Sequence, residues 1–212
     1  MPRVTAKICG LSTPETLDAA IAGGAGHVGF VFYPPSPRAV SFDAVRGLAV
    51  RVPGHVAKVG VFVDPCNALI DQAVDSGMLD AIQLHKVTPE RAAALRRHSR
   101  REVWVAVAVK TRADLDTAAN YRQAADKILY DAKTPDGALP GGMGVRFDWG
   151  LLDGFAHPLP WALSGGLTAD NVGEAARRTG ARLVDASSGV ETAPGVKDVD
   201  KIAAFLQAVG QL

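Results

Sequence analysis

The chain has 212 residues, enough for one large domain or two small ones. Hydrophobic residues make up 48% and charged residues 21%, a balance typical of a soluble globular enzyme and not of a disordered chain. The formal net charge of +1 argues against nucleic acid or an acidic membrane surface as a partner, and no apolar run approaches the roughly 20 residues needed to cross a bilayer.

The N-terminus and the cysteines indicate a cytoplasmic protein. Residues 1–4 enter a strand-like segment directly, so we expect no signal peptide. Cys9 and Cys66 do not make a disulfide framework, which fits a reducing compartment. Since no histidine stands at a metal-ligand spacing from a cysteine or another histidine, we expect no metal site.

Short β-branched runs alternate with amphipathic, alanine-rich segments along the whole chain. The runs predict strands at 6–9, 28–33, 57–63, 81–85, 103–109, 127–131, 161–164 and 183–187. The segments between them predict helices that include 13–22, 42–50, 67–76, 89–97, 169–179 and 199–209. Several of these helices follow a residue that can cap them, such as Thr13, Thr88 and Thr168.

Eight strands that alternate with helices indicate a parallel sheet, and eight such units can close into a (β/α)8 barrel. We therefore predict an α/β protein with one catalytic barrel domain over residues 1–212. The alternative is an open, doubly wound sheet. An open sheet of that kind usually carries a dinucleotide-type glycine motif in its first turn, and residues 9–12 (CGLS) do not form one.

Two glycine–serine turns follow the last two predicted strands. The first contains Gly165 and Gly166, and the second contains Ser187, Ser188 and Gly189. Glycine lets backbone N–H groups approach an anion closely, and this place in a barrel is where phosphate groups bind. Either turn alone would fit an ordinary strand-to-helix connection, but the pair predicts a phosphorylated small-molecule ligand.

The first predicted strand carries two reactive side chains on one face. Lys7 and Cys9 point the same way and Ile8 points to the opposite side, because strand residues alternate between faces. An ammonium near a thiol lowers the pKa of the thiol and favours the thiolate, which can act as a base or nucleophile. The alternative is a cysteine that serves as a small buried hydrophobe, which the first strand by itself favours.

Four further polar residues stand near the ends of predicted strands. Asp131 ends the sixth strand, where catalytic groups lie in barrels; its alternatives are a helix cap or a salt bridge to Lys133. Arg38 follows three prolines that stiffen its segment, which suits recognition of a carboxylate, although a solvated surface arginine is the ordinary case. His85 could contact a ligand or be satisfied within the protein. Asp185 could face the same cavity or brace the second glycine–serine turn.

Taken in order, the segments resemble the phosphoribosylanthranilate isomerase family of tryptophan biosynthesis, whose fold is the (β/α)8 barrel. The ordered set covers the chain from its first strand to its last: KICG at 7–10, GFVF at 29–32, SPR at 36–38, VGVF at 59–62, QLH at 83–85, LYD at 129–131, GGMG at 141–144, FDW at 147–149, SGGL at 164–167 with Asn171, and SSGVE at 187–191. The sequence departs from the family pattern at Lys86, where glycine is usual, and at Met143, where threonine is usual.

The resemblance implies a role for each matching residue. Cys9 would be the general base, Asp131 the general acid, and Arg38 the partner of the anthranilate carboxylate. Gly165, Gly166, Ser187, Ser188 and Gly189 would bind the phosphate. We also expect substrate contacts from a set of residues around the mouth and its lid loop: Lys7, His85, Gly142, Gly144 and Asp185.

The implied reaction is an Amadori rearrangement of a phosphorylated aminosugar, which needs one acid and one base and no metal or other cofactor. We expect the apolar mouth to raise the pKa of Asp131 and Lys7 to lower the pKa of Cys9. The alternatives are isomerisation of the related histidine-pathway aminoaldose, in which two aspartates usually act, and a silent barrel that only binds phosphorylated metabolites. A monomer and a homodimer both fit the sequence.

Overall fold

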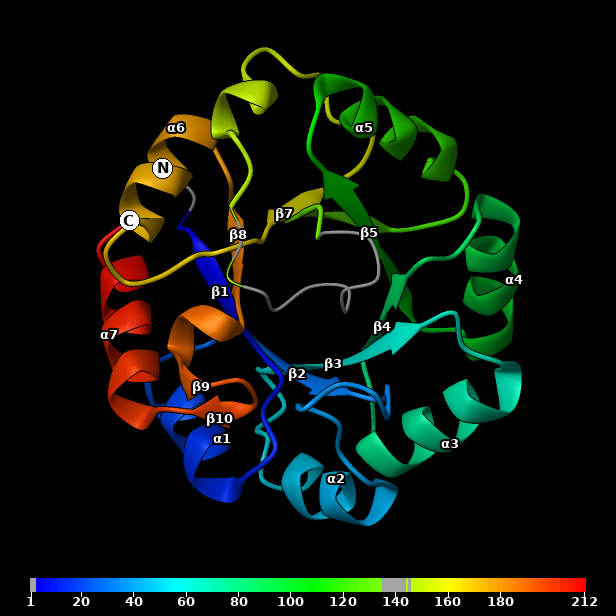
Figure 1. Cartoon of the computed structure of the whole chain (residues 1–212). Coiled ribbons are helices and arrows are strands. Elements are labelled where there is room, and N and C mark those ends of the chain that lie inside the picture. The colour runs from blue at the N-terminus through cyan, green and yellow to red at the C-terminus, as the bar shows by residue number, and fades with distance from the viewer. Residues whose placement is uncertain (1–2, 135–143, 145) are drawn as a thin grey trace.

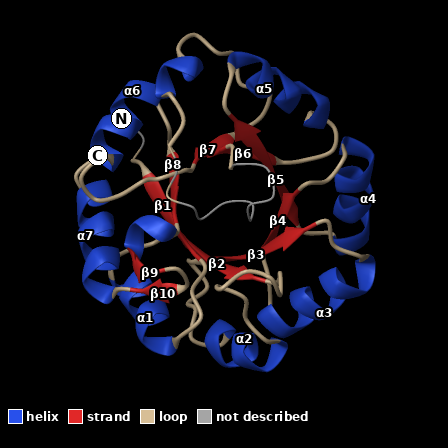
Figure 2. Ribbon diagram, in the orientation of Figure 1, coloured by secondary structure: helices blue, strands red, loops and turns tan. Residues whose placement is uncertain are grey.

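The structure, a computed structural model, describes residues 3–134, 144 and 146–212. Eight parallel strands form a closed barrel, and helices surround it as an outer ring (Figures 1 and 2). The strands are β1 (Thr5–Cys9), β2 (His27–Val31), β3 (Ala57–Val63), β4 (Ala81–His85), β5 (Glu102–Val109), β6 (Lys127–Ala132), β7 (Trp161–Leu163) and β8 (Leu183–Ala186).

Pairing between the first and last strands closes the barrel. Thr5 lies opposite Leu183, and Lys7 lies opposite Asp185, in a parallel β1–β8 register. An open sheet would leave two edge strands with one neighbour each, whereas every strand here pairs with two, so the predicted barrel is confirmed and the open, doubly wound alternative is wrong.

Seven α-helices are present in the part of the chain that the structure describes: α1 (Pro14–Ala22), α2 (Phe42–Ala49), α3 (Asn67–Gly77), α4 (Pro89–Ser99), α5 (Arg112–Asp116), α6 (Val172–Thr179) and α7 (Val199–Gly210). Thr13 and Thr88 cap α1 and α4 as predicted, since each side chain accepts a backbone N–H of the first turn. Within the described residues, no helix has the length and apolar character required to cross a membrane.

The predicted start of α6 is wrong. The helix begins at Val172 with Asn171 as its N-cap, not at the predicted residue 169 after Thr168. Asn171 explains the delay, because its Oδ1 accepts the Thr168 N–H at 2.9 Å and its Nδ2 donates to the Gly166 carbonyl at 2.9 Å. These bonds hold 166–171 as a turn in place of a first helical turn.

The alternation of side chains along β1 divides the interior into two regions. Ile8 packs outward into the large cluster between strands and helices, and Lys7 and Cys9 face the barrel axis, as the alternation predicts. A separate layer fills the barrel near the N-terminal ends of the strands: Val59, Ala81, Trp104, Leu129, Ala162 and Leu183. This layer closes one end of the barrel, so only the carboxyl-end mouth can receive a ligand.

Three connections differ from the predicted pattern. Between β5 and β6 the chain forms the short α5 and a 3-10 helix at Thr117–Tyr121, in a connection for which no helix bounds were predicted. A 3-10 turn at Trp149–Leu152 lies between β6 and β7. After β8 comes an antiparallel hairpin of β9 (Glu191–Ala193) and β10 (Val196–Lys197), which the sequence pattern did not predict.

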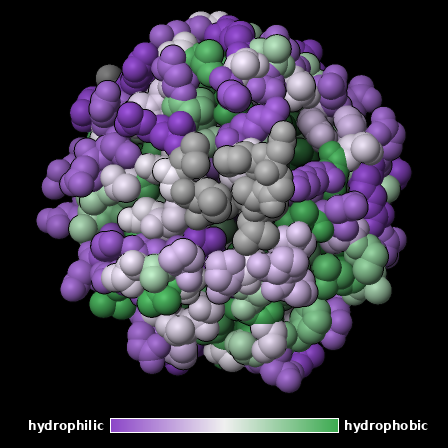
Figure 3. Space-filling model, in the orientation of Figure 1, coloured by the Kyte–Doolittle hydropathy of each residue, from purple (hydrophilic) through white to green (hydrophobic). Residues whose placement is uncertain are grey.

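Viewed from the side shown in Figure 1, the outer margin of the molecule is largely hydrophilic (Figure 3).

Candidate active site

The carboxyl ends of the strands surround a cavity at the barrel mouth. Its wall combines apolar side chains from β2, β3 and β6 with polar side chains from nearly every side of the barrel. Most of the predicted catalytic and substrate-binding residues meet here: Cys9, Arg38, His85, Asp131, Asp185 and Ser187 line the cavity, together with Gln83 and Ser164.

A buried ion pair lies at the floor of this mouth. Lys7 is fully buried, and its Nζ donates to Asp185 Oδ1 at 2.8 Å across the β1–β8 register. Burial alone would lower the pKa of Lys7, but Asp185 and Cys9 raise it above its ordinary value, so the ammonium stays charged. Asp185 lines the cavity, which is the first of its predicted alternatives. Its Oδ2 also accepts a hydrogen bond from Ser164 Oγ at 3.2 Å, so the turn that it contacts is the first glycine–serine turn and not the second, as the other alternative had it.

Cys9 is 7% exposed and free of any disulfide. Burial raises the pKa of its thiol above the ordinary value, and the nearby Lys7 and Lys197 ammonium groups oppose this rise without cancelling it. Lys7 does act to lower the pKa of Cys9, as expected, but the expected net lowering is wrong. Burial at the closed floor of the barrel raises the pKa by more than the Lys7 charge lowers it.

Asp131 lies at the end of β6 and is 8% exposed. Burial, and next the charge of Asp185, raises its pKa to about 7, as the apolar mouth predicts. The proposed salt bridge to Lys133 is absent from the described residues, since the Lys133 ammonium lies 3.9 Å from Asp114 instead. Asp131 Oδ1 accepts the Ala132 N–H at 2.9 Å. The carboxyl group is thus held in place, and its raised pKa lets it keep a proton up to a near-neutral pH.

The first glycine–serine turn packs against the acid. Gly165 and Gly166 have φ angles of 92° and 62°, in the left-handed region that favours glycine. A Cβ on Gly165 would lie 2.9 Å from the Ala132 nitrogen and 3.2 Å from Asp131 Oδ1. The turn therefore needs glycine both for its shape and for this close approach.

The second turn lies directly against the first. Ser188 and Gly189 belong to a 3-10 turn, Ser188–Val190, and a Cβ on Gly189 would overlap the Leu167 carbonyl oxygen. Ser187 Oγ donates to the Cys9 carbonyl at 3.2 Å, which ties this turn to β1. The five predicted phosphate-binding residues thus form one adjoining pair of turns.

Of the two glycines that were predicted to contact the substrate from the lid loop, the structure describes only Gly144. Gly144 has a φ of 68°, and a Cβ there would lie 3.7 Å from Ser188 Oγ, so it lies beside the second turn. Gly142 lies outside the described residues, as does Met143.

Arg38 is a buried residue and not a solvated surface arginine. Its Nε and Nη2 donate to Glu191 Oε1 and Oε2, each at 2.7 Å, in a bidentate ion pair with the β9–β10 hairpin. Lys197 Nζ donates to Glu191 Oε1 at 2.6 Å and to the Ser187 carbonyl at 2.9 Å. The hairpin therefore connects Arg38 to the second glycine–serine turn.

Glu191 and Lys197 are site residues that the sequence reasoning missed. Glu191 stood in the SSGVE segment without an assigned role, and a carboxylate two residues after a glycine turn was the available signal. Lys197 carried no signal, because only the hairpin brings it back to Ser187.

His85 faces the mouth beside a third residue that the sequence reasoning missed, Gln83. Burial, and next the Lys7 charge, lowers the pKa of His85 to about 4, so the ring is neutral at physiological pH. Its Nε2 lies 3.0 Å from Gln83 Nε2. An amide nitrogen can only donate, so His85 Nε2 accepts and its ring proton is on Nδ1. Lys86, where glycine is usual in the family, has a φ of 54°, which accounts for that preference.

A closed (β/α)8 barrel whose mouth carries a thiol, a carboxyl group of near-neutral pKa and a pair of adjoining glycine–serine turns is typical of barrel enzymes that transfer protons on small ligands. The profile of the N-(5'phosphoribosyl)anthranilate (PRA) isomerase family matches residues 6–208. The chain belongs to this family.

Individual relatives agree over nearly their full lengths. The N-(5'-phosphoribosyl)anthranilate isomerase of Zymomonas mobilis subsp. pomaceae is 56% identical over 97% of this chain and 98% of its own. The Rhodospirillum centenum isomerase is 51% identical over 99% of both chains.

Solved structures of the family match as well. The Thermotoga maritima enzyme superposes with a TM-score of 0.86 at 38% identity, covering 99% of this chain and 100% of its own. A phosphoribosyl anthranilate isomerase in complex with reduced 1-(o-carboxyphenylamino)-1-deoxyribulose 5-phosphate superposes with a TM-score of 0.84 at 36% identity, with the same coverage.

Proposed function

We propose that this protein isomerises N-(5'-phosphoribosyl)anthranilate to 1-(2-carboxyphenylamino)-1-deoxy-D-ribulose 5-phosphate, an Amadori rearrangement in tryptophan biosynthesis. The observation that carries the proposal is that the Cys9 thiol and the Asp131 carboxyl, whose pKa is about 7, line one cavity beside the paired glycine–serine turns. Family membership and the names of the relatives support the same reaction.

In the proposed mechanism Asp131 is the general acid. The substrate is a furanose that must open before it can rearrange, so its ring oxygen needs a proton. A carboxyl group that is protonated near neutral pH can supply that proton, and the ionised product is tolerated because Asp131 keeps its bond from the Ala132 N–H. Ring opening leaves a Schiff base between C1 and the anthranilate nitrogen.

Cys9 is the proposed general base. As the thiolate it takes the proton from C2 of the Schiff base, which gives an enolamine. C1 then gains a proton while the C2 hydroxyl loses one, so the rearrangement consumes no net proton. The thiolate must form in a buried place that disfavours it, and the ammonium groups of Lys7 and Lys197 favour its charge there.

The remaining residues are proposed to hold the two anionic ends of the substrate. The turns around Gly165, Gly166, Ser187, Ser188 and Gly189 would bind the phosphate through backbone N–H groups. Arg38 would meet the anthranilate carboxylate, with its guanidinium oriented by Glu191. We place the reaction in the cytoplasm, where the free thiols Cys9 and Cys66 stay reduced.

The experiment is a turnover assay with N-(5'-phosphoribosyl)anthranilate, followed by the loss of anthranilate fluorescence. Asp131→Ala and Cys9→Ala should each lower kcat by about 10²–10⁴ with a smaller effect on KM, because each removes a proton-transfer group. Cys66→Ala is the matched control: this cysteine is exposed at the start of α3, and its loss should leave kcat unchanged. No turnover by the wild-type protein would overturn the proposed function.

A further inference from the structure

Gln83 carries an unusual buried atom at the barrel mouth. The side chain is 2% exposed, and its Oε1 has no hydrogen-bond partner among the described residues. Other buried atoms share this condition in the described part of the chain, such as Ser76 Oγ and Trp104 Nε1, but Gln83 alone of these residues lines the cavity. A buried acceptor without a donor lowers the stability of the fold by about 1–3 kcal/mol, so a glutamine at this position calls for a functional explanation.

The surroundings orient the amide. Gln83 and His85 are two residues apart on β4 and therefore point to the same side, toward the barrel axis. The Gln83 amide nitrogen donates to His85 Nε2 at 3.0 Å, and His85 remains neutral and can accept this bond at physiological pH. The bond fixes the amide nitrogen on His85 and leaves the carbonyl oxygen, buried in the cavity wall, as the unsatisfied group of this side chain.

The chemistry of an acceptor restricts which part of a ligand can satisfy it. A carboxylate only accepts hydrogen bonds, and a phosphate near neutral pH mainly accepts them, so neither anionic end of the proposed substrate suits Gln83 Oε1. The hydroxyl groups and the N–H group of the aminosugar portion are donors. They lie between the two anionic ends and so within the cavity that Gln83 lines.

We propose that Gln83 is a substrate-binding residue whose Oε1 accepts a hydrogen bond from a hydroxyl or N–H donor of the aminosugar. This inference rests on the proposed function. It gives Gln83 a part in specificity, because a buried acceptor that the ligand must satisfy discriminates against ligands that lack the donor.

The test measures binding of two probes to the Gln83→Met variant, in which an apolar side chain of similar length replaces the amide. The probes are reduced 1-(o-carboxyphenylamino)-1-deoxyribulose 5-phosphate, which carries the aminosugar donors, and inorganic phosphate, which carries only the anion. We expect the dissociation constant of the first probe to rise about tenfold, that of phosphate to stay within about twofold, and the Tm to stay level or rise.

Two controls keep the result decisive. Ser76→Ala removes a buried hydroxyl that, like Gln83 Oε1, has no hydrogen-bond partner among the described residues. Ser76 lies on α3 and does not line the mouth, so this variant should change neither dissociation constant. Gln83→Leu serves as a second apolar variant if Gln83→Met does not fold.

The failures of the two proposals are distinguishable. An unchanged affinity for the reduced product analogue, or an equal loss of both ligands together with a lower Tm, would overturn the role of Gln83 while wild-type turnover still supports the proposed function. An absence of wild-type turnover would instead contradict the proposed function itself.

Discussion

Asp131 and Asp185 are carboxyl groups of one cavity that differ in their partners. Asp185 accepts a charged hydrogen bond from Lys7 at 2.8 Å, whereas Asp131 accepts a backbone N–H and faces the charge of Asp185. A cation stabilises the ionised form of a carboxyl, and a like charge stabilises the neutral form. Asp185 is therefore paired with a cation, whereas the surroundings of Asp131 favour its protonated form.

The raised pKa of Asp131 makes the stability of the protein depend on pH. Because its pKa rises from 3.8 in the unfolded chain to about 7 in the fold, the folded state binds this proton more tightly, and the stabilisation is present below pH 3.8 and lost as the pH rises through 7. The shift corresponds to on the order of 4 kcal/mol. Asp131→Asn cannot ionise, so the stability of the wild type relative to this variant should fall between pH 4 and 8. Urea denaturation across this range measures it, and a constant difference would contradict the assigned pKa.

At the residue scale, sequence reasoning predicted the direction of the pKa shift correctly for Asp131 but not for Cys9. The neighbours Lys7 and Cys9 predicted a lowered thiol pKa, and only the closed barrel reveals the burial that reverses the net shift. Gln83 escaped notice for a related reason. A glutamine on a strand carries no sequence signal of an unsatisfied atom, since that depends on which side chains surround it in the fold.

The β9–β10 hairpin is the element that completes the site. Glu191 at its start holds Arg38 through two bonds of 2.7 Å, and Lys197 at its end holds both Glu191 and Ser187. Its turn fits closely over the segment that carries Arg38: Gly195 has a φ of 83°, and a Cβ there would lie 2.5 Å from the Pro37 carbonyl oxygen. The hairpin thus orients Arg38 before any ligand binds.

We expect Glu191→Gln to weaken substrate binding more than turnover. The amide cannot make two charge-assisted bonds to Arg38, and it leaves two buried cations side by side, so stability should fall by about 3 kcal/mol. KM should rise about tenfold with kcat within about threefold, because the variant loses the orientation of Arg38, the proposed partner of the substrate carboxylate, and keeps the proposed acid and base, Asp131 and Cys9. Glu191→Asp keeps the charge if the amide variant does not fold.

Thr192→Ala provides the matched control for this prediction. Thr192 lies in the same strand of the hairpin and is exposed, so its truncation should leave KM unchanged. A KM for Glu191→Gln equal to that of the wild type would show that Arg38 needs no support from the hairpin.

At the scale of elements, the long periodic segments were predictable and the short ones were not. The barrel strands follow from β-branched runs, and their ends agree with the structure to within two residues. The hairpin strands have three and two residues, too few to show an alternation of apolar and polar residues. The ion pair between Glu191 and Lys197 holds the two strands in place instead. The start of α6 was misplaced because the Asn171 side chain competes with the helix for backbone groups.

At the scale of the whole molecule, closure decides which residues meet. The sequence pattern alone fitted a barrel or an open sheet, and the pairing of β1 with β8 brings Lys7 to Asp185, and Cys9 to Ser187, from opposite ends of the chain. The number of strand–helix units and the lack of a dinucleotide-type glycine motif favoured the barrel, and the resemblance to a known family agreed with it. Strand spacing by itself does not record whether the first and last strands are neighbours.

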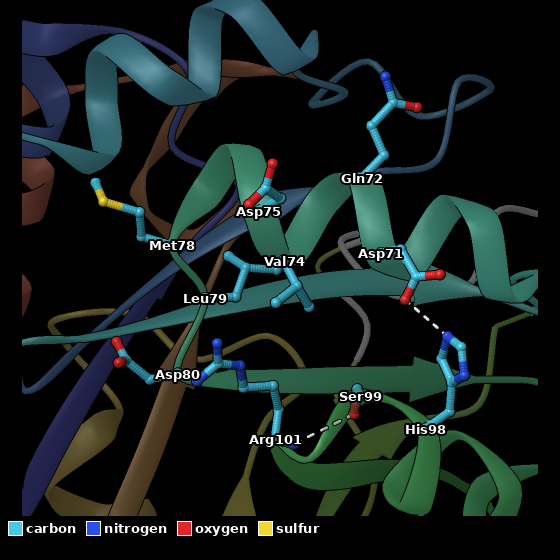
Figure 4. Close-up of a pocket in the computed structure, with 10 residues that line it drawn as sticks. All are labelled: Asp71, Gln72, Val74, Asp75, Met78, Leu79, Asp80, His98, Ser99 and Arg101. Atoms are coloured by element: carbon cyan, nitrogen blue, oxygen red, sulfur yellow. Dashed lines mark hydrogen bonds and ion pairs between the residues drawn. The ribbon is translucent and has the colours of Figure 1, made fainter.

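The barrel also separates the catalytic mouth from a groove on its outer wall, toward the other end. This groove lies between α3 and α4 and is lined mainly by the later parts of the two helices and the residues that follow them (Figure 4). His98 Nε2 and Asp71 Oδ1 are 2.7 Å apart across it, with exposed side-chain fractions of 34% and 60%. Residues toward the N-terminal ends of barrel strands contribute to stability and not to chemistry, and an exposed ion pair contributes about 0–1 kcal/mol.

His98→Ala should therefore lower the free energy of unfolding by no more than about 1 kcal/mol and leave kcat/KM within about twofold of the wild type. The reason is geometric: none of the residues that line the groove also lines the mouth, and the buried layer that contains Trp104 and Leu129 separates the floor of the mouth from the closed end of the barrel. Urea denaturation and the fluorescence turnover assay measure the two quantities on one preparation. A tenfold loss of kcat/KM with unchanged stability would mean that the wall between α3 and α4 is coupled to the mouth, and the division of the barrel into a catalytic end and a structural end would then be wrong.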